Sequence, residues 1–178
     1  MYNKEAMQKK VLSEISLYHG DISMPKGFAI NTNILSVDIL KHQINTSIKS
    51  TSSFPFSKTW SMLNTYITDH INVKYNLTLI NKSTWGNIYK PNEVTTPLLN
   101  IDPVDLRNSP DYVLLYGVAV KDCSVRIYYD DNRRKGGSWD IPLEYNKFIM
   151  FPSTCMYHLT NKQTDSLNFV QTITYEYV

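Results

Sequence analysis

Residues 148–158 read FIMFPSTCMYH, and this stretch contains the end of one short strand and the start of another. The segment 148–151 is apolar, and a second run at 156–160 follows the break at Pro152. Short apolar or alternating runs that are separated by turn residues are typical of β-strands. The stretch therefore predicts two consecutive strands.

Similar runs recur on both sides of this stretch, from residue 77 to the end of the chain. The predicted strands are 77–80, 83–89, 112–120, 124–129, 139–143, 148–151, 156–160 and 167–177. They are bounded by turn residues such as Gly136 and Gly137. About eight strands at short spacing, with no helices between them, favour an antiparallel sandwich or a small barrel.

The first third of the chain has a helical period instead. In residues 3–18 the apolar side chains recur at spacings of three and four, which predicts an amphipathic helix that ends at Gly20. A second helix is predicted over 36–49, with Ser36 as its N-cap and Asp38 in its first turn.

A third helix is predicted to begin at Ser57 and to end at Asn76. Its apolar side chains recur at helical spacing, namely Trp60, Leu63, Ile67 and Ile71. Helices followed by strands define an α+β class. We expect one domain, 1–178, in which a helical support region, 1–76, packs on a jelly-roll-like β-barrel core, 77–178.

Composition excludes several classes of protein. The chain has 178 residues, of which 42% are hydrophobic, so it is not disordered. The 18 basic and 16 acidic residues give no basic excess, so no nucleic-acid partner is expected. No apolar run approaches the roughly 18 residues of a membrane span, and Glu5 and Glu14 make the start unlike a signal peptide. We therefore expect a protein that is not secreted, with Cys123 and Cys155 as reduced thiols.

Three segments carry a resemblance to a known family. They are Trp85-Gly-Asn-Ile-Tyr89, Tyr112-Val-Leu-Leu-Tyr-Gly-Val118, and Phe148-Ile-Met-Phe-Pro-Ser153 followed by His158. The chain resembles the prolyl-hydroxylase-like 2-oxoglutarate/Fe(II) oxygenases of the phage and bacterial type. The resemblance implies a double-stranded β-helix core. It also implies a distal iron ligand at His158, a preceding loop with an H-x-D or H-x-H motif, and a later Arg for the cosubstrate carboxylate.

Two parts of that ligand set are missing from the sequence. Two His and one carboxylate on one face of the metal are the ligands of this chemistry. The segment 97–102, where the motif should fall, contains no His, so His158 and Asp102 are the only weak metal candidates, with Asp105 as an alternative carboxylate. Asn168, ten residues past His158, is not an Arg. We therefore expect no cofactor, with Fe(II) and 2-oxoglutarate bound only under the enzymatic alternative.

Several residues have a structural interpretation beside the functional one. His158 is expected to be a hydrogen-bonded core or rim residue, and the run 130–137 a solvated hairpin loop. The last strand is expected at a half-buried sheet edge, where Tyr175 and Tyr177 are interface candidates. The connection 90–110, which has four prolines and no predicted structure of its own, is expected to contact protein.

Three functions remain open. The favoured one is a non-catalytic oxygenase-like scaffold, a structural or assembly component of a bacteriophage neck or tail, in a homo-oligomer or with other virion subunits. Its support includes 14 Lys against 4 Arg, a bias common in phages. It would lie in the host cytoplasm or the virion. The others are a dioxygenase with atypical iron ligands, and a jelly roll that binds a small molecule or glycan. An enzymatic role is not favoured, but it stays open.

Overall fold

The computed structural model describes residues 14–47, 56–130 and 136–178. These residues form two α-helices, a short 3-10 helix and eight strands. The elements are β1 (Tyr18–Asp21), α1 (Thr32–Ser47), α2 (Lys58–Tyr75), β2 (Leu79–Tyr89), η1 (Leu106–Asn108), β3 (Tyr112–Ala119), β4 (Cys123–Tyr129), β5 (Gly137–Leu143), β6 (Lys147–Pro152), β7 (Tyr157–Asn161) and β8 (Asn168–Tyr177).

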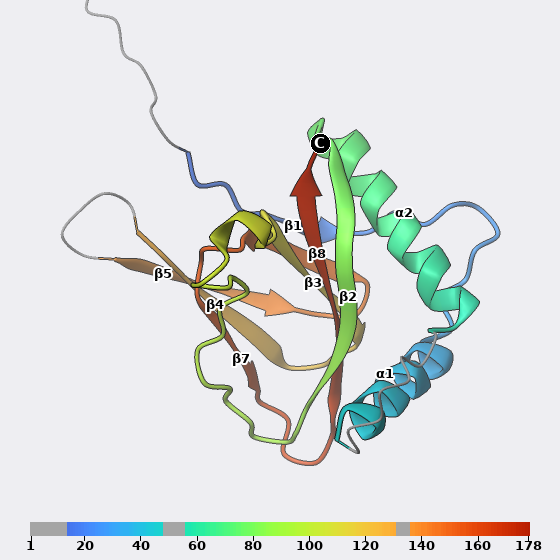
Figure 1. Cartoon of the computed structure of the whole chain (residues 1–178). Helices are drawn as coiled ribbons and strands as arrows, with labels where there is room; N and C mark the ends of the chain where they lie inside the picture. Colours follow the sequence, from blue (N-terminus) through green and yellow to red (C-terminus); the bar gives the residue numbers. More distant parts are fainter. Residues whose placement is uncertain (1–13, 48–55, 131–135) are drawn as a thin grey trace, which may run out of the picture.

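The strands form two antiparallel sheets. The larger sheet has the order β1-β6-β3-β8-β2, and the smaller one has the order β5-β4-β7. The start of the long connection 90–110 adds to the smaller sheet, because Val94 and Leu98 form antiparallel bridges with Thr160 and Tyr157 of β7. The two sheets face each other as in a jelly roll (Figure 1). The predicted β-rich, jelly-roll-like fold is therefore confirmed.

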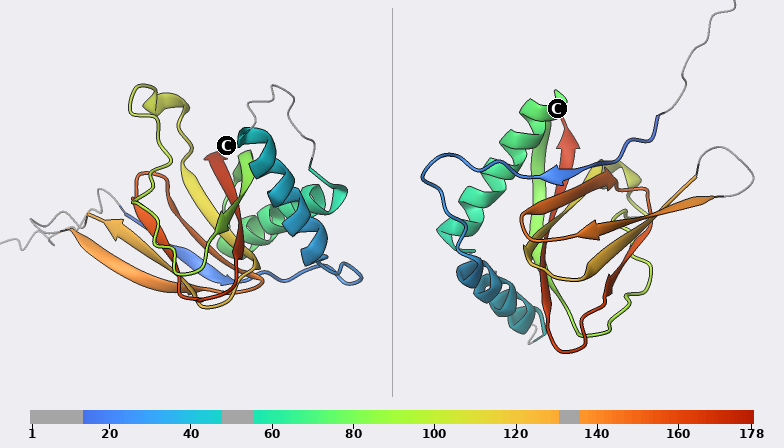
Figure 2. Two further views of the ribbon diagram at one scale, coloured as in Figure 1. Left: turned by 90° about the horizontal axis from the view of Figure 1, so that it is seen from below. Right: turned by 180° about the vertical axis from the view of Figure 1, so that it is seen from behind.

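Two hydrophobic clusters hold the layers together. One lies between the sheets and includes Val113 and Leu115 of β3, Val125 of β4, Ile149 of β6 and Leu159 of β7. The other lies between the helices and the outer face of the larger sheet, where Leu35 of α1 and Leu63 of α2 join residues of β3, β6 and β8. The views from below and from behind show α1 and α2 on this face (Figure 2).

The third predicted helix is confirmed as α2. Ser57 is its N-cap, with Oγ accepting a hydrogen bond from the backbone N–H of Trp60, and Asn76 ends it in the left-handed conformation at φ 52°. The side chains of Trp60, Leu63, Ile67 and Ile71 are all buried. A hydroxyl at the N-cap and an Asn after the last turn satisfy the backbone groups that a helix leaves unpaired.

The start of the chain differs from the predicted helices. Residues 3–13 of the first lie outside the described residues, and 18–21 form strand β1, in which Gly20 pairs with Phe148 of β6 rather than ending a helix. Helix α1 begins at Thr32 rather than at Ser36, because Asn31 Oδ1 accepts from the backbone N–H of Ile34. The region before residue 76 is therefore not purely helical.

The last strand also differs from its prediction. β8 is not an edge strand, because β2 pairs with one side of it and β3 with the other. Cys123 and Cys155 are free and buried, as expected for reduced thiols. Within the ranges that the structure describes, neither helix is long and apolar enough to cross a membrane. The segment 130–137 falls mostly outside those ranges.

Candidate functional site

His158 lies on the outer face of the smaller sheet, away from the space between the sheets. Along β7 its neighbours Tyr157 and Leu159 are buried, whereas His158 is half-buried. Its Nδ1 is 3.1 Å from the hydroxyl oxygen of Tyr128 on β4. Successive side chains of a strand point to opposite faces, so His158 cannot reach a metal ion held inside the barrel.

Charged side chains surround His158 on this outer face. His158 lies opposite Arg126 in the β4–β7 ladder. Arg126 donates two hydrogen bonds to the carboxylate of Asp140, at 2.8 and 2.6 Å, and these lower the pKa of Asp140. Both side chains are largely exposed, so this is a surface ion pair.

Asp102 and Asp105 lie in the connection 90–110 and are exposed. Asp102 Oδ1 accepts from the backbone N–H of Val104 at 2.9 Å, and Asp105 Oδ2 accepts from the amide of Asn108 at 2.7 Å. Both carboxylates thus stabilise turns of their own loop, on a different part of the molecule from His158. In the described part of the chain, no group of three or more His, Cys, Asp or Glu could hold a metal.

Three other side chains meet inside the barrel, where the resemblance places the metal. Leu98 and Tyr157 lie directly opposite each other and exchange both backbone hydrogen bonds, at 2.7 and 3.0 Å. Asn100 donates from Nδ2 to the hydroxyl of Tyr157 at 3.0 Å. Leu98 and Asn100 have the spacing of the H-x-D motif, and Tyr157 is the inward-facing neighbour of His158. These three residues are therefore the inward-facing candidates for the ligand set that the resemblance implies.

The chemistry of these three residues does not fit Fe(II). Leu98 has no donor atom, and Asn100 turns its NH₂ group toward Tyr157. Tyr157 is only 3% exposed, and burial raises the pKa of its phenol despite the opposing hydrogen bond from Asn100. A protonated phenol, an amide and an aliphatic side chain cannot take the place of two imidazoles and a carboxylate as metal ligands. Sequence reasoning missed Tyr157 and Asn100.

Asn168, which lies ten residues past His158, is hydrogen-bonded within the structure. Asn168 is fully buried. Its side-chain amide accepts a hydrogen bond from the backbone N–H of Lys121 at 2.9 Å and donates one to the backbone carbonyl of Lys121 at 3.1 Å. The amide of Gln163 donates to the same Oδ1 at 2.8 Å. An amide with these partners offers no positive charge to a carboxylate, so this position does not fit 2-oxoglutarate.

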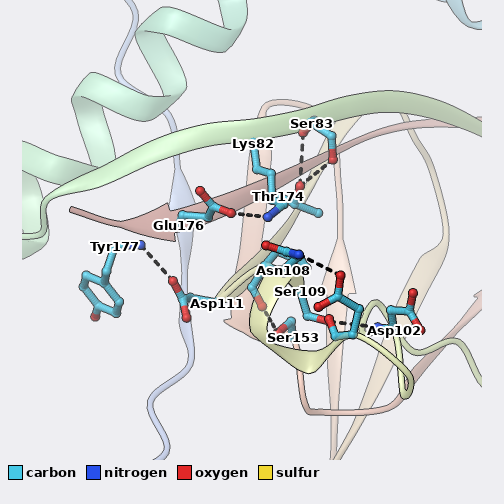
Figure 3. A network of polar contacts seen from close by, with 12 residues as sticks. Lys82, Ser83, Asp102, Asn108, Ser109, Asp111, Ser153, Thr174, Glu176 and Tyr177 are labelled. Atoms are coloured by element: carbon cyan, nitrogen blue, oxygen red, sulfur yellow. Dashed lines mark hydrogen bonds and ion pairs between the residues drawn. The ribbon is translucent and has the colours of Figure 1, made fainter.

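A cavity of about 470 Å³ opens beside Asn100, between β2 and the connection 90–110. We call it the loop pocket. Its lining residues are Lys82, Ser83, Trp85, Leu99, Asn100, Ile101, Asp102, Pro103, Pro110 and Thr174. Figure 3 shows the polar contacts around it, including the ion pair of Lys82 with Glu176 and the contact of Ser83 with Thr174.

The two interface candidates differ in their exposure. Tyr175 is fully buried, and its hydroxyl lies 3.1 Å from Thr68 Oγ1 of α2, so its side chain does not face a partner. Tyr177 is half exposed, and its ring packs edge-on against Tyr112 with centroids 5.5 Å apart. The structure thus leaves Tyr177 as the exposed member of the pair.

The fold is that of the prolyl-hydroxylase-like 2-oxoglutarate/Fe(II) oxygenases, which confirms the resemblance at the level of the fold. A Pseudomonas putida prolyl-4-hydroxylase superposes with a TM-score of 0.58 at 10% identity, covering 91% of this chain and 92% of that one. HygX from Streptomyces hygroscopicus, with nickel and 2-oxoglutarate bound, gives a TM-score of 0.56 at 9% identity, covering 92% of this chain and 83% of that one. The viral collagen prolyl hydroxylase of Paramecium Bursaria Chlorella virus-1 gives 0.55 at 11%, covering 91% and 96%. No family model and no curated protein sequence matches the chain.

These neighbours correct the prediction that the chain has no cofactor. HygX has been solved with nickel and 2-oxoglutarate and also with iron, and the viral hydroxylase as a 2-oxoglutarate complex. A fold that holds these groups in its neighbours contradicts the prediction. The residues at the ligand positions here still differ from the implied set, and at 9–11% identity the likeness extends to the fold alone.

Proposed function

We propose that this chain is a non-catalytic protein that uses the oxygenase fold as a scaffold and acts by contacting other protein subunits. The particle would be a bacteriophage virion, in its neck or tail, with further copies of the chain or other virion proteins as partners. It would occur in the host cytoplasm before assembly and in the virion afterwards. Two of the neighbours named above are prolyl hydroxylases, so the virion role rests on the surface and on the composition.

The observation that carries this proposal is the exposed apolar surface of the connection 90–110. Val104 is 94% exposed, Leu106 63% and Val94 61%, and Leu99 is also exposed. Scattered exposed apolar side chains are ordinary, but several on one segment are typical of a protein contact. In the family that the chain resembles, the corresponding segment carries the H-x-D or H-x-H metal motif.

The connection is held in place, which favours a contact role over a loose loop. Its first half lies along β7, where Thr95 exchanges hydrogen bonds with Leu159. Its second half is fixed by the backbone N–H of Asp102, which donates to Ser109 Oγ at 2.8 Å, and by the short helix η1. A surface that is already ordered loses little conformational freedom on binding. The prediction of a loop without structure is therefore wrong for its bridged half.

Tyr177 lies next to the end of this connection and extends the proposed contact surface. The carboxylate of Asp111, which follows Pro110, accepts from the backbone N–H of Tyr177 at 2.8 Å. Tyr is enriched at protein interfaces because its ring buries a large area while its hydroxyl stays hydrogen-bonded. The end of the connection and the end of β8 therefore lie side by side.

The variant V104D/L106D tests the contact. We expect its incorporation into purified phage particles to fall by about tenfold or more, because two charges would be buried at the interface. Its thermal midpoint should shift by only a few degrees, because both side chains already face water. The measurement is an immunoblot of the tagged full-length chain in sedimented particles, with melting followed by circular dichroism.

Val73 supplies the matched control, because it is 84% exposed on α2, on another part of the surface. V73D should be incorporated normally. Normal incorporation of a folded V104D/L106D would refute the contact role. Point substitutions are preferable to a deletion of 92–106, because Val94 and Leu98 pair with β7 and their loss would damage the sheet.

A second candidate function is a 2-oxoglutarate/Fe(II)-dependent dioxygenase with atypical ligands. The observation that favours it is the fold, which HygX and the prolyl hydroxylases use with these groups. His158 cannot bind one metal ion together with Asp102 or Asp105, because His158 lies on the outer face of β7 and both carboxylates lie in turns of the connection 90–110.

Under this candidate, the chain loaded anaerobically with Fe(II) should release succinate from 2-oxoglutarate when oxygen is admitted. Turnover should persist in H158A, because that side chain faces outward. The assay is succinate release per chain, with metal content measured on the same sample. Release no faster than that of Fe(II) alone would exclude the second candidate without touching the contact proposal.

A further inference from the structure

The loop pocket combines an aromatic ring with neutral hydrogen-bonding groups. Trp85 of β2 lies in its wall, together with the hydroxyls of Ser83 and Thr174 and the amide of Asn100. Its volume of about 470 Å³ falls in the range of small-molecule sites. We propose that the loop pocket binds a neutral carbohydrate of one or two sugar rings, a role separate from the protein contact.

The charges around the pocket exclude an acidic ligand. Lys82 is the only cation among the lining residues, and it is already paired with Glu176. Asp102 adds a negative charge at the opposite wall. A carboxylate or phosphate would therefore meet a repelling carboxylate and no unpaired cation, whereas a neutral ligand incurs no such cost.

The hydrogen-bonding groups match a ligand that carries many hydroxyls. Ser83 Oγ and Thr174 Oγ1 lie 2.5 Å apart, and Thr174 Oγ1 also lies 3.5 Å from the carbonyl oxygen of Ser83. A hydroxyl oxygen has two lone pairs, so Ser83 can still accept a hydrogen bond from a ligand. Asn100 uses one amide hydrogen on Tyr157, and its NH₂ group carries two. A sugar hydroxyl can donate to a carboxylate and accept from an amide at the same time. Hydroxyls, an amide and Asp102 on two walls therefore suit a sugar.

Trp85 supplies the apolar part of the recognition. A sugar ring has a face of C–H groups beside its hydroxyls. The flat indole ring of Trp85, which lies in the pocket wall, can stack on that face. Trp85 is half-buried, with part of its surface in the pocket. One aromatic side chain with a few convergent polar groups is typical of small-ligand sites.

The pocket walls are fixed before any ligand binds. On one side Ser83 and Trp85 are paired with β8 in the sheet. On the other, the backbone N–H of Asp102 donates to Ser109, and Ser153 donates from Oγ to the carbonyl of Pro110. Figure 3 shows Ser83, Asp102, Ser109 and Ser153 in one polar network. Ordered walls reduce the entropy lost on binding.

The test is saturation-transfer NMR on the full chain with maltose, cellobiose, lactose and N,N′-diacetylchitobiose, and with glucuronic acid as the acidic probe. We expect transfer to at least one neutral disaccharide, with an affinity in the millimolar range, and weaker transfer to glucuronic acid. W85L should weaken binding about tenfold or more, and W85Y should restore part of it. D102N should also weaken it, while its amide oxygen still accepts from Val104.

Trp139 is the matched control, because it is half exposed on β5 of the other sheet, and W139L should bind as the unsubstituted chain does. V104D/L106D should bind sugar normally, which separates this proposal from the protein contact. Three results would overturn it: no transfer to any neutral disaccharide, binding unchanged in folded W85L and D102N, or tighter binding of glucuronic acid. Folding of each variant is checked by circular dichroism.

Discussion

Gly117→Ala is expected to lower the free energy of unfolding by about 3 kcal/mol or more, at the upper end for an overfilled core. A Cβ at this position would lie 2.0 Å from the carbonyl oxygen of Glu144 and 2.8 Å from its carbon. Both are backbone atoms, so no side-chain rotation can relieve the clash. Gly117 also accepts from the backbone N–H of Asn146 at 2.9 Å, and the clash would break this contact.

Gly136 provides the control, because a Cβ there would lie 3.4 Å from the carbonyl oxygen of Tyr129, an ordinary contact distance. Gly136→Ala should change the unfolding free energy by less than about 1 kcal/mol. Urea denaturation followed by far-ultraviolet circular dichroism measures both. If Gly117→Ala were as stable as Gly136→Ala, the tight turn between β5 and β6 would not be as the structure describes it.

The variant L98H/N100D/Y157H should bind Co(II) roughly 100-fold more tightly than the unsubstituted chain. Leu98 and Tyr157 lie opposite each other on the inner face, and Asn100 reaches the Tyr157 hydroxyl. Two His and one Asp at these positions would place the three ligands of a facial triad on one side of a metal ion. The measurements are titration calorimetry and the visible absorption of bound Co(II).

Two further variants make this result specific. H158A in the rebuilt protein should leave the affinity unchanged, because that side chain lies on the outer face. N100D/Y157H, with two ligands, should bind more weakly than the triple variant. Tyr157 packs against Phe151 with ring centroids 5.0 Å apart, so stability must be measured too. A folded triple variant with no gain in affinity, or one that loses the metal through H158A, would contradict this placement of the ligand positions.

Local sequence signals predicted the elements that depend on local physics. Ser57 and Asn76 bound α2 because a hydroxyl cap and a left-handed Asn act within one helical turn. Strands β4 and β7 were readable because their alternation in burial matches the alternation in sequence. Strands β3 and β6 were readable as short apolar runs between turn residues, and they are buried along nearly their whole length. The predicted strands 124–129 and 139–143 begin and end within two residues of the bounds of β4 and β5.

Elements that depend on distant partners could not be read in the same way. The four residues 18–21 are a strand because β6 supplies their hydrogen bonds, and nothing in their own sequence requires it. The central place of β8 follows from pairing with β2 and β3, which the alternation of its own residues does not specify. A strand at an edge and one inside a sheet can carry the same pattern.

The two segments of the candidate site could be picked out in the sequence, but not the residues through which they meet. The segment 97–102 and the end of the Phe-Pro-Ser element do meet in the barrel, through Leu98, Asn100 and Tyr157. His158 was chosen by its chemistry, although it lies one position out of phase with buried Tyr157 and Leu159. The alternation of inward and outward side chains along β7 was the sequence pattern that could have indicated Tyr157. Asn100 had no such signal, because only the pairing of its loop with β7 brings it near Tyr157.

The central place of β8 also has a consequence for how the chain reaches its native state. β2 and β3 each use one side of β8, so the middle of the larger sheet stays open until this last of the described elements has been synthesised. Partners such as Leu79 and Tyr177 are distant in sequence, and such non-local pairing slows folding. A nascent chain would hold β2 and the apolar strand β3 without their shared neighbour. We therefore expect a period during synthesis when the protein is prone to aggregate and is a substrate for chaperones.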